Sequence, residues 1–226
     1  MAKLLVVTGG SKGIGRAIIK KFASEGFDTI TCSRNKADFS DINGEVHHLV
    51  ANMSVKSEIK AFTDFVAGFN RPVDVLVNNA GYFLPGQVID EPEGTLESMI
   101  EGNLYSAYYT SRGIAPAMRT LRNGHIFNMC SIASIQAYPN GGSYAISKFA
   151  MLGLSKMLRE ELKESGVRVT AVLPGATLTA SWEGTNLPDE RFINSIDVAE
   201  AVWGAYNLSK RTVVEEILIR PQLGDL

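Results

Sequence analysis

Near its start the chain reads Thr8-Gly9-Gly10-Ser11-Lys12-Gly13-Ile14-Gly15, a turn that joins a short apolar run to a helical pattern. Its glycines permit a tight turn, close approach of the backbone to a pyrophosphate, and close packing of the helix on the strand. The helix that begins near Ile14 would present unpaired N–H groups and the positive end of its dipole to that anion. A glycine-rich turn without a ligand is the alternative for the motif alone, but its place after the first strand favours dinucleotide binding.

Outward from this turn, short β-branched runs alternate with longer helical patterns. The runs are expected to be strands at Leu4–Val7, Asp28–Ser33, Val46–Val50, Val73–Val77, His125–Cys130, Val167–Leu173 and Val214–Ile219. Helical patterns lie between them at 14–25, 55–69, 95–121, 143–165 and 196–209. Several runs are apolar nearly throughout, as parallel strands buried on both faces must be. The succession predicts one Rossmann-type α/β domain over 1–226, with a doubly wound parallel sheet of about seven strands and helices on both faces.

Composition and charge restrict the kind of protein. Of the 226 residues, 45% are hydrophobic and 20% are charged, which suits one domain with a large core. The net charge of −2, without a basic block, argues against nucleic-acid binding. No run resembles a signal-peptide core or a membrane span, and the two cysteines and three histidines lack the spacing of metal ligands. We therefore expect a cytoplasmic protein that needs no metal ion.

Three loops follow the carboxyl ends of strands, where ligands bind in open α/β sheets. We expect the segments near 82–94, 132–143 and 176–195 to rim one cleft and to contact the substrate. Their larger side chains would either line an apolar substrate pocket or pack as loop cover, and they are Tyr82, Phe83, Ile135, Tyr138 and Trp182.

The end of the second strand indicates which dinucleotide binds. NAD-binding proteins carry an acid there, about twenty residues after the glycines, for the ribose hydroxyls. This chain has Ser33 and Arg34 instead, and Lys12 lies in the glycine turn. A carboxylate would repel a 2′-phosphate, whereas hydroxyl, guanidinium and ammonium groups would bind it. The pattern predicts NADP(H) over NAD(H); the alternative is that Arg34 and Lys12 are ordinary solvated charges.

A candidate catalytic group lies in the second half of the chain. Tyr144 and Lys148 are four residues apart in a helical pattern, so they share one helix face. Carbonyl reduction needs a hydride and a proton, and a tyrosine with a pKa of about 10 exchanges protons slowly near neutrality. A lysine about 5 Å away would lower that pKa with roughly 3 kcal/mol of interaction energy at an effective dielectric near 20. Ser131 follows a strand and can direct the substrate oxygen, and Asn103 falls inside the helical pattern at 95–121.

Taken together, these residues resemble the short-chain dehydrogenase/reductase family, in its oxidoreductase branch of roughly 250 residues. The matching motifs are the turn at 8–15, Asn78-Asn79-Ala80-Gly81, Asn103, Ser131, Tyr144 with Lys148, and Pro174-Gly175. The resemblance implies that Tyr144 is the general acid/base and that Lys148 lowers its pKa and binds the nicotinamide ribose. It further implies that Ser131 holds the carbonyl and that Asn103 anchors a water in a proton relay to Lys148.

The resemblance also implies a site for NADP(H), with NADPH as the reductant. Its residues would be Thr8, Gly9, Ser11, Lys12, Gly13, Ile14, Gly15, Ser33, Arg34, Asn52, Met53, Asn79, Ala80, Gly81, Tyr144, Lys148, Pro174, Gly175, Thr177 and Thr179. Two features depart from the family pattern. Asn52 stands where members commonly carry an aspartate for the adenine amino group, and the segment after Gly175 is compact, which argues against the usual two-helix substrate lid.

These observations predict an NADP(H)-dependent oxidoreductase that interconverts a carbonyl and a secondary alcohol on a small or medium substrate. A 3-oxoacyl-type reductase and a generalist ketone or aldehyde reductase both fit. The alternative from another class is a non-catalytic dinucleotide-binding regulatory protein. The family resemblance also implies a homodimer or homotetramer that packs through the helices near 95–121 and 143–165. An apolar stripe on the second of these would then face a partner or, alternatively, the chain's own sheet: Ile146, Phe149, Ala150, Gly153 and Met157.

Overall fold

The first strand, β1 (Lys3–Thr8), shows how the core is divided. Leu4 and Val6 belong to one buried cluster, and Leu5 and Val7 belong to another. Because side chains alternate along a strand, the two clusters lie on opposite faces of the sheet. Each face therefore needs its own layer of helices.

The computed structural model describes residues 1–179, 182 and 184–226, and in these it contains one seven-stranded sheet in the order β3-β2-β1-β4-β5-β6-β7. The strands after β1 are β2 (Phe27–Ser33), β3 (Val46–Val50), β4 (Val75–Asn78), β5 (His125–Met129), β6 (Arg168–Pro174) and β7 (Glu216–Ile219). Every neighbouring pair is parallel. The prediction of a doubly wound parallel sheet is thus confirmed, with strand ends shifted by one or two residues.

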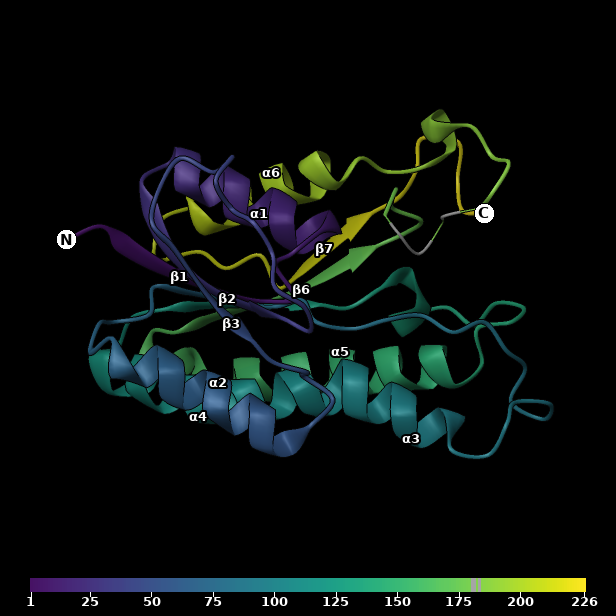
Figure 1. The fold of residues 1–226 in the computed structure, drawn as a ribbon, viewed down its shortest axis with the longest axis horizontal. Coiled ribbons are helices and arrows are strands. Elements are labelled where there is room, and N and C mark those ends of the chain that lie inside the picture. The colour runs from purple at the N-terminus through teal and green to yellow at the C-terminus, as the bar shows by residue number, and fades with distance from the viewer. Residues whose placement is uncertain (180–181, 183) are drawn as a thin grey trace.

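Helices cover both faces of the sheet (Figure 1). On one face lie α1 (Gly13–Ser24) and α6 (Ser195–Tyr206), and on the other lie α2 (Lys56–Gly68), α4 (Ser106–Leu121) and α5 (Gly142–Leu162). Phe22 of α1 and Val202 of α6 join one buried cluster, while Phe62 of α2 and Met118 of α4 join the other. The two-layer arrangement follows from these apolar helix faces.

The predicted single helix at 95–121 is wrong in one respect. The structure divides it into α3 (Thr95–Met99), a π-helical segment η1 (Ile100–Tyr105) and α4. A π-helical turn is wider than an α-helical one, and such turns are frequent at functional sites. Asn103 lies within this wider turn, and its side chain contacts both the loop after β4 and helix α5.

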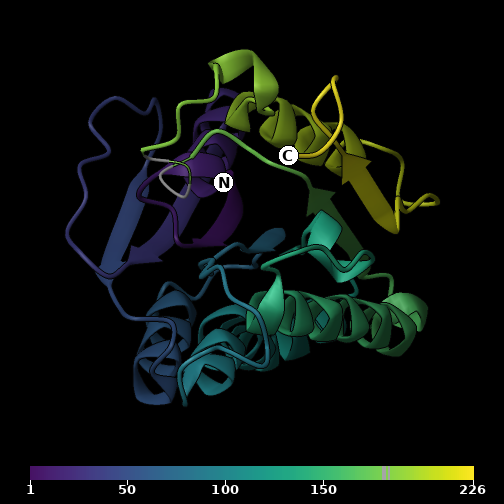
Figure 2. The same ribbon diagram turned by 90° about the vertical axis from the view of Figure 1, so that its right-hand side faces the viewer.

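The strand order reverses between β1 and β4, since the chain runs outward from β1 to β3 and then returns to the other side of β1. A crevice forms at such a point, beyond the carboxyl ends of the strands. The end-on view in Figure 2 separates the two helix layers on either side of the sheet. The site residues described below come from segments that follow β1, β2, β3, β4, β5 and β6.

Candidate active site

The glycine turn after β1 has a backbone that only glycine adopts without strain. Gly9 and Gly13 have φ angles of +73° and +57°. A Cβ on Gly15 would lie 2.5 Å from the Gly9 carbonyl oxygen, so a larger residue does not fit there. Lys12, the N-cap of α1, has an extended backbone, and its side chain makes no capping hydrogen bond. The first N–H groups of α1 are therefore available to an anion.

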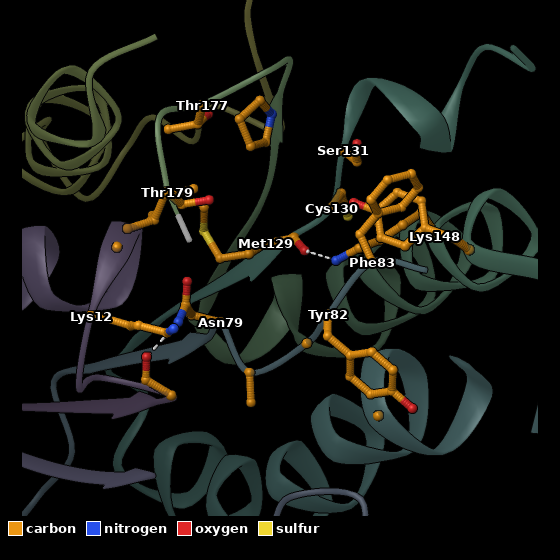
Figure 3. A pocket seen from close by; sticks show the side chains of 18 of the residues that line it. Lys12, Asn79, Tyr82, Phe83, Met129, Cys130, Ser131, Lys148, Thr177 and Thr179 are labelled. Carbon is orange, nitrogen blue, oxygen red and sulfur yellow. Dashed lines mark hydrogen bonds between the residues drawn. The ribbon is translucent and has the colours of Figure 1, made fainter. Parts of the chain in front are cut away.

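A cavity of about 480 Å³ opens beside this turn and runs to the ends of β5 and β6. Figure 3 shows how side chains from both halves of the sheet gather around it. Predicted site residues that line it are Gly9, Ser11, Lys12, Gly13, Ile14, Ser33, Arg34, Asn52, Met53, Asn79, Ala80, Gly81, Ser131, Tyr144, Lys148, Pro174, Gly175, Thr177 and Thr179. The structure thus brings together residues from seven separate segments of the chain.

Three predicted site residues, Thr8, Gly15 and Asn103, are not among those that line the cavity. The Thr8 hydroxyl accepts hydrogen bonds from the backbone N–H groups of Asn79 and Ala80, both at 3.0 Å, and so joins the ends of β1 and β4. Gly15 packs against the Asn79 side chain. Thr8 and Gly15 thus contact residues that line the cavity without lining it themselves.

Asn103 is almost fully buried, with 1% of its surface exposed. Its Oδ1 accepts from the Tyr82 N–H at 2.8 Å, and its Nδ2 donates to the Tyr82 carbonyl at 3.1 Å and to the Ser147 hydroxyl at 3.0 Å. The side chain therefore fastens the loop after β4 to helix α5. Its predicted part in a water relay stays a prediction.

Tyr144 and Lys148 lie one turn apart on α5, and both line the cavity. The Lys148 ammonium is 5.7 Å from the centre of the Tyr144 ring and donates to the Met129 carbonyl at 2.8 Å (Figure 3). Ser131 begins the short helix η2 (Ile132–Ser134), and its hydroxyl accepts from the Ala133 N–H at 3.1 Å. That acceptor role leaves the hydroxyl proton of Ser131 for another partner.

Burial is the largest effect on the pKa values of Tyr144 and Lys148. It raises the pKa of Tyr144, and the hydrogen bond from Ser131 lowers it by less. Burial also lowers the pKa of Lys148 to about 8. The sequence predicted that the lysine charge would depress the tyrosine pKa against the desolvation of the phenolate, and in the structure desolvation is the largest effect on that pKa. The part of Lys148 in proton transfer stays a prediction.

At the opposite end of the cavity, Ser33 ends β2, and its hydroxyl donates to the Asn35 carbonyl at 2.8 Å and lies 2.7 Å from His48 Nε2. Arg34 and Lys12 are exposed at the cavity rim. Asn52 also lines the cavity, and its Oδ1 accepts from the Ser54 N–H at 3.1 Å. Among the described lining residues the only carboxylate side chain is that of Asp225, which pairs with Arg220 at 3.0 Å.

Aromatic side chains form the wall near Tyr144. Tyr82, Phe83, Tyr138 and Trp182 line the cavity, and the Phe83 ring meets the Tyr144 ring edge to face at 4.9 Å between centres. Ile135 is 45% exposed and is not among the lining residues. Three other lining residues belong to the predicted substrate segments: Ile132, Gln136 and Ala176. The lining residues that sequence reasoning missed are Ala51, Ser54, Gly102, Met129, Cys130, Asp225 and Leu226.

The predicted substrate segment 176–195 is only partly described, because residues 180, 181 and 183 lie outside the described residues. Of the remainder, Thr177 and Ile193 form an isolated parallel bridge, and Asp189–Arg191 forms one short 3₁₀ turn, η5. Across residues 1–179, 182 and 184–226, no group of three or more acidic, histidine or cysteine side chains is arranged to hold a metal ion. None of the described helices is long and apolar enough to cross a membrane.

Comparison with known proteins decides the family. The family model for short chain dehydrogenases matches residues 3–189. The chain belongs to the short-chain dehydrogenase family. The family resemblance predicted from the turn at 8–15 and the pair Tyr144 and Lys148 is thereby confirmed, and the protein is an oxidoreductase of that family.

Individual family members resemble this short-chain dehydrogenase over their full length. The sepiapterin reductase of Chlorobaculum tepidum is 32% identical over 100% of this chain and 99% of its own. An alcohol dehydrogenase of Thermococcus sibiricus, solved with 5-hydroxy-NADP, superposes with a TM-score of 0.90 at 27% identity, over 98% of this chain and 97% of that one. A metagenomic short-chain oxidoreductase solved with NADP has a TM-score of 0.84 at 30% identity, over 97% of each chain. These NADP-bound relatives agree with the cofactor predicted from the sequence.

Proposed function

We propose that the protein is an NADP(H)-dependent oxidoreductase that interconverts a carbonyl and a secondary alcohol, with Tyr144 as the general acid/base. One observation carries the proposal. Tyr144, Lys148 and Ser131 converge on the same cavity that begins at the glycine turn, although they come from α5 and the end of β5. A fold that only bound a dinucleotide would not need a phenol, an ammonium group and a hydroxyl at that point.

The residues present fit a dinucleotide. A Cβ on Gly9 would come within 3.1 Å of the Ala80 Cα, so this glycine lets the turn after β1 pack closely on the segment after β4, as the turn of a dinucleotide-binding fold requires. Ser11 to Ile14 would hold the phosphates at the start of α1, and Asn79 to Gly81 would contact the adenosine ribose. Residues 174–179 would contact the carboxamide of the nicotinamide through backbone and hydroxyl groups.

Each group in the site has one task. When bound, the reduced nicotinamide supplies the hydride. The Ser131 hydroxyl donates a hydrogen bond to the substrate oxygen and directs it, and the Tyr144 hydroxyl gives that oxygen its proton. The Lys148 ammonium stabilises the phenolate that remains. Because burial raises the Tyr144 pKa, the proton donor stays protonated through the neutral range, which favours reduction.

A panel of carbonyl compounds, followed by NADPH absorbance, tests the proposal. The panel should contain an acyl thioester for the 3-oxoacyl alternative, a diketone, a sugar, an aromatic ketone and an aliphatic aldehyde. Sepiapterin belongs in it because a relative at 32% identity carries that activity in its name. We expect turnover with at least one member, and higher kcat/KM with NADPH than with NADH. Tight NADPH binding without any turnover would instead support the regulatory, non-catalytic alternative.

We expect Arg34→Asp to raise the KM for NADPH at least tenfold and to change the KM for NADH little. The substitution removes a charge-assisted contact to the 2′-phosphate and places a repelling carboxylate at the cavity rim. Steady-state kinetics with both cofactors measures the effect. Lys36→Asp is a matched control, because Lys36 is exposed nearby and is not among the cavity-lining residues. Equal changes for both cofactors would place Arg34 away from the 2′-phosphate.

The proposed homo-oligomer has a candidate surface on α5. Ile146, Phe149 and Met157 are 43%, 47% and 57% exposed, so these members of the apolar stripe do not face the chain's own sheet. Exposed apolar side chains that share a helix face are typical of subunit contacts. The homodimer or homotetramer and the cytoplasmic location stay predictions, and size-exclusion chromatography with light scattering measures the first.

A further inference from the structure

The carboxylate of Glu91, in a loop distant in the sequence, hydrogen-bonds the first turn of helix α5. Glu91 lies between β4 and α3, and its Oε1 accepts from the Ser143 backbone N–H at 2.9 Å. Its Oε2 accepts a second, short hydrogen bond from the Ser143 hydroxyl. Ser143 is 2% exposed and directly precedes Tyr144 in the first turn of α5. Both carboxylate oxygens of Glu91 thus accept hydrogen bonds from Ser143, the residue next to the proposed proton donor Tyr144.

Two glycines leave room for this carboxylate. Gly142 has a φ angle of +39°, and a Cβ there would lie 2.0 Å from Glu91 Oε1. A Cβ on Gly86 would lie 2.7 Å from Glu91 Cγ. The Gly86 N–H also donates to the Asn140 carbonyl at 3.1 Å, which joins the same two loops a second time.

The contact with Glu91 gives the first turn of α5 a hydrogen-bond acceptor. The first N–H groups of an α-helix have no partner within it, and a negative charge near that end is favoured by the helix dipole. Gly141, the N-cap of α5, has no side chain that could supply an acceptor. Hydrogen bonds from N–H and O–H groups to a carboxylate are about twice as strong as neutral ones. Glu91 therefore gives the first turn of α5 an acceptor that the N-cap residue cannot provide.

We infer that Glu91 is a positioning residue, which caps α5 from the loop between β4 and α3 and so holds Tyr144 in the position required for proton transfer. The inference rests on the proposed function. Phe83, from the same loop as Glu91, packs on the Tyr144 ring, so the loop constrains the tyrosine at its backbone and at its side chain. Loss of the cap would let the first turn fray and would misplace the phenol relative to the substrate oxygen.

Glu91→Ala, Glu91→Gln and the control Glu97→Ala test the inference. Glu97 is an exposed acid on α3, outside the cavity lining. We expect Glu91→Ala to lower kcat at least tenfold while the Kd for NADPH stays within twofold, because the glycine turn is untouched. Glu91→Gln keeps one carbonyl acceptor for the Ser143 N–H, so it should retain kcat within about threefold. Glu97→Ala should match the wild type.

Global destabilisation alone would not produce this split. It would lower the melting temperature, but it would not reduce kcat at constant NADPH affinity and then restore kcat in the glutamine variant. A kcat for Glu91→Ala equal to that of Glu97→Ala would overturn the inference, as would a parallel loss of NADPH binding. If Glu91→Ala does not fold, Ser143→Ala takes its place, because it removes the hydroxyl that donates to Glu91 Oε2. We then expect a lower kcat in Ser143→Ala than in Glu91→Gln, and an unchanged kcat in Ser143→Ala would overturn the inference.

Amide hydrogen exchange separates this inference from the proposed function. In Glu91→Ala we expect faster exchange at residues 143–146 than in Glu97→Ala, with unchanged exchange in α1. That result requires no turnover, so it stands even if no carbonyl is reduced. Unchanged amide exchange at residues 143–146 would contradict the inference that Glu91 caps α5. A wild-type protein that reduces no carbonyl would contradict only the proposed function.

Discussion

Tyr144→Phe is expected to lower kcat about 10³-fold while the Kd for NADPH changes less than twofold. The substitution deletes only the hydroxyl that gives the substrate oxygen its proton, and general acid catalysis contributes rate factors of about 10² to 10⁴. The phenyl ring keeps its edge-to-face packing against Phe83, so the cavity wall should persist. Steady-state kinetics and fluorescence titration of NADPH measure the two quantities.

Tyr138→Phe is the matched control for that variant. Tyr138 lines the same cavity and carries the same phenol group, and burial raises its pKa to about 12. We expect it to lose less than tenfold in kcat. A Tyr144→Phe enzyme that keeps more than a tenth of the wild-type kcat would show that another group donates the proton.

Lys148→Met is expected to abolish most of the activity and yet to stabilise the fold at pH 7. The ammonium is buried, and a pKa lowered from 10.5 to about 8 corresponds to a cost of about 3 kcal/mol for holding the charge in the folded protein. Methionine has a similar volume but leaves the Met129 carbonyl without its donor, which costs about 1–3 kcal/mol. We expect a net gain of about 1 kcal/mol and a fall in kcat of at least about 10²-fold.

The lowered pKa of Lys148 also predicts how the difference in stability between the wild type and Lys148→Met changes with pH. Between pH 8 and 10.5 the unfolded lysine binds a proton that the folded one has released, so the wild type gains stability as the pH rises. Lys148→Met lacks that gain, so the stability curves of the two proteins should cross in this window. Urea unfolding at pH 7 and pH 10.5 measures the crossing. A constant difference at both values would mean that Lys148 does not titrate within this window.

The sheet was predictable because its signals are local. The glycine turn and the apolar β-branched runs carry their own conformational preferences, and residues such as Leu5 and Val77 are apolar because both faces of the sheet are buried. The break in the helix at 95–121 has no such signal. It involves Asn103 and its contacts with Tyr82 and Ser147, which lie 21 and 44 residues away in the sequence.

The site residues likewise fall into those that local sequence signals predict and those that depend on contacts distant in the sequence. Side chains at strand ends, such as Ser131 and Arg34, were located because strand and turn order fixes where they emerge. The Met129 carbonyl was missed because every residue carries a carbonyl and only the fold shows which one faces Lys148. The size of the desolvation effect on the Tyr144 pKa was not predictable, because it depends on how completely the loops enclose the phenol, which residue spacing does not reveal.

The double link between the loop at 82–94 and the loop at 132–143 has a practical consequence for engineering. The Gly86 amide and the Glu91 carboxylate both reach across to the neighbouring loop. Transplanting either segment alone from a homologue would therefore strip its neighbour of a backbone tie and a helix cap. Chimeras built to change substrate preference should exchange the two segments as a pair.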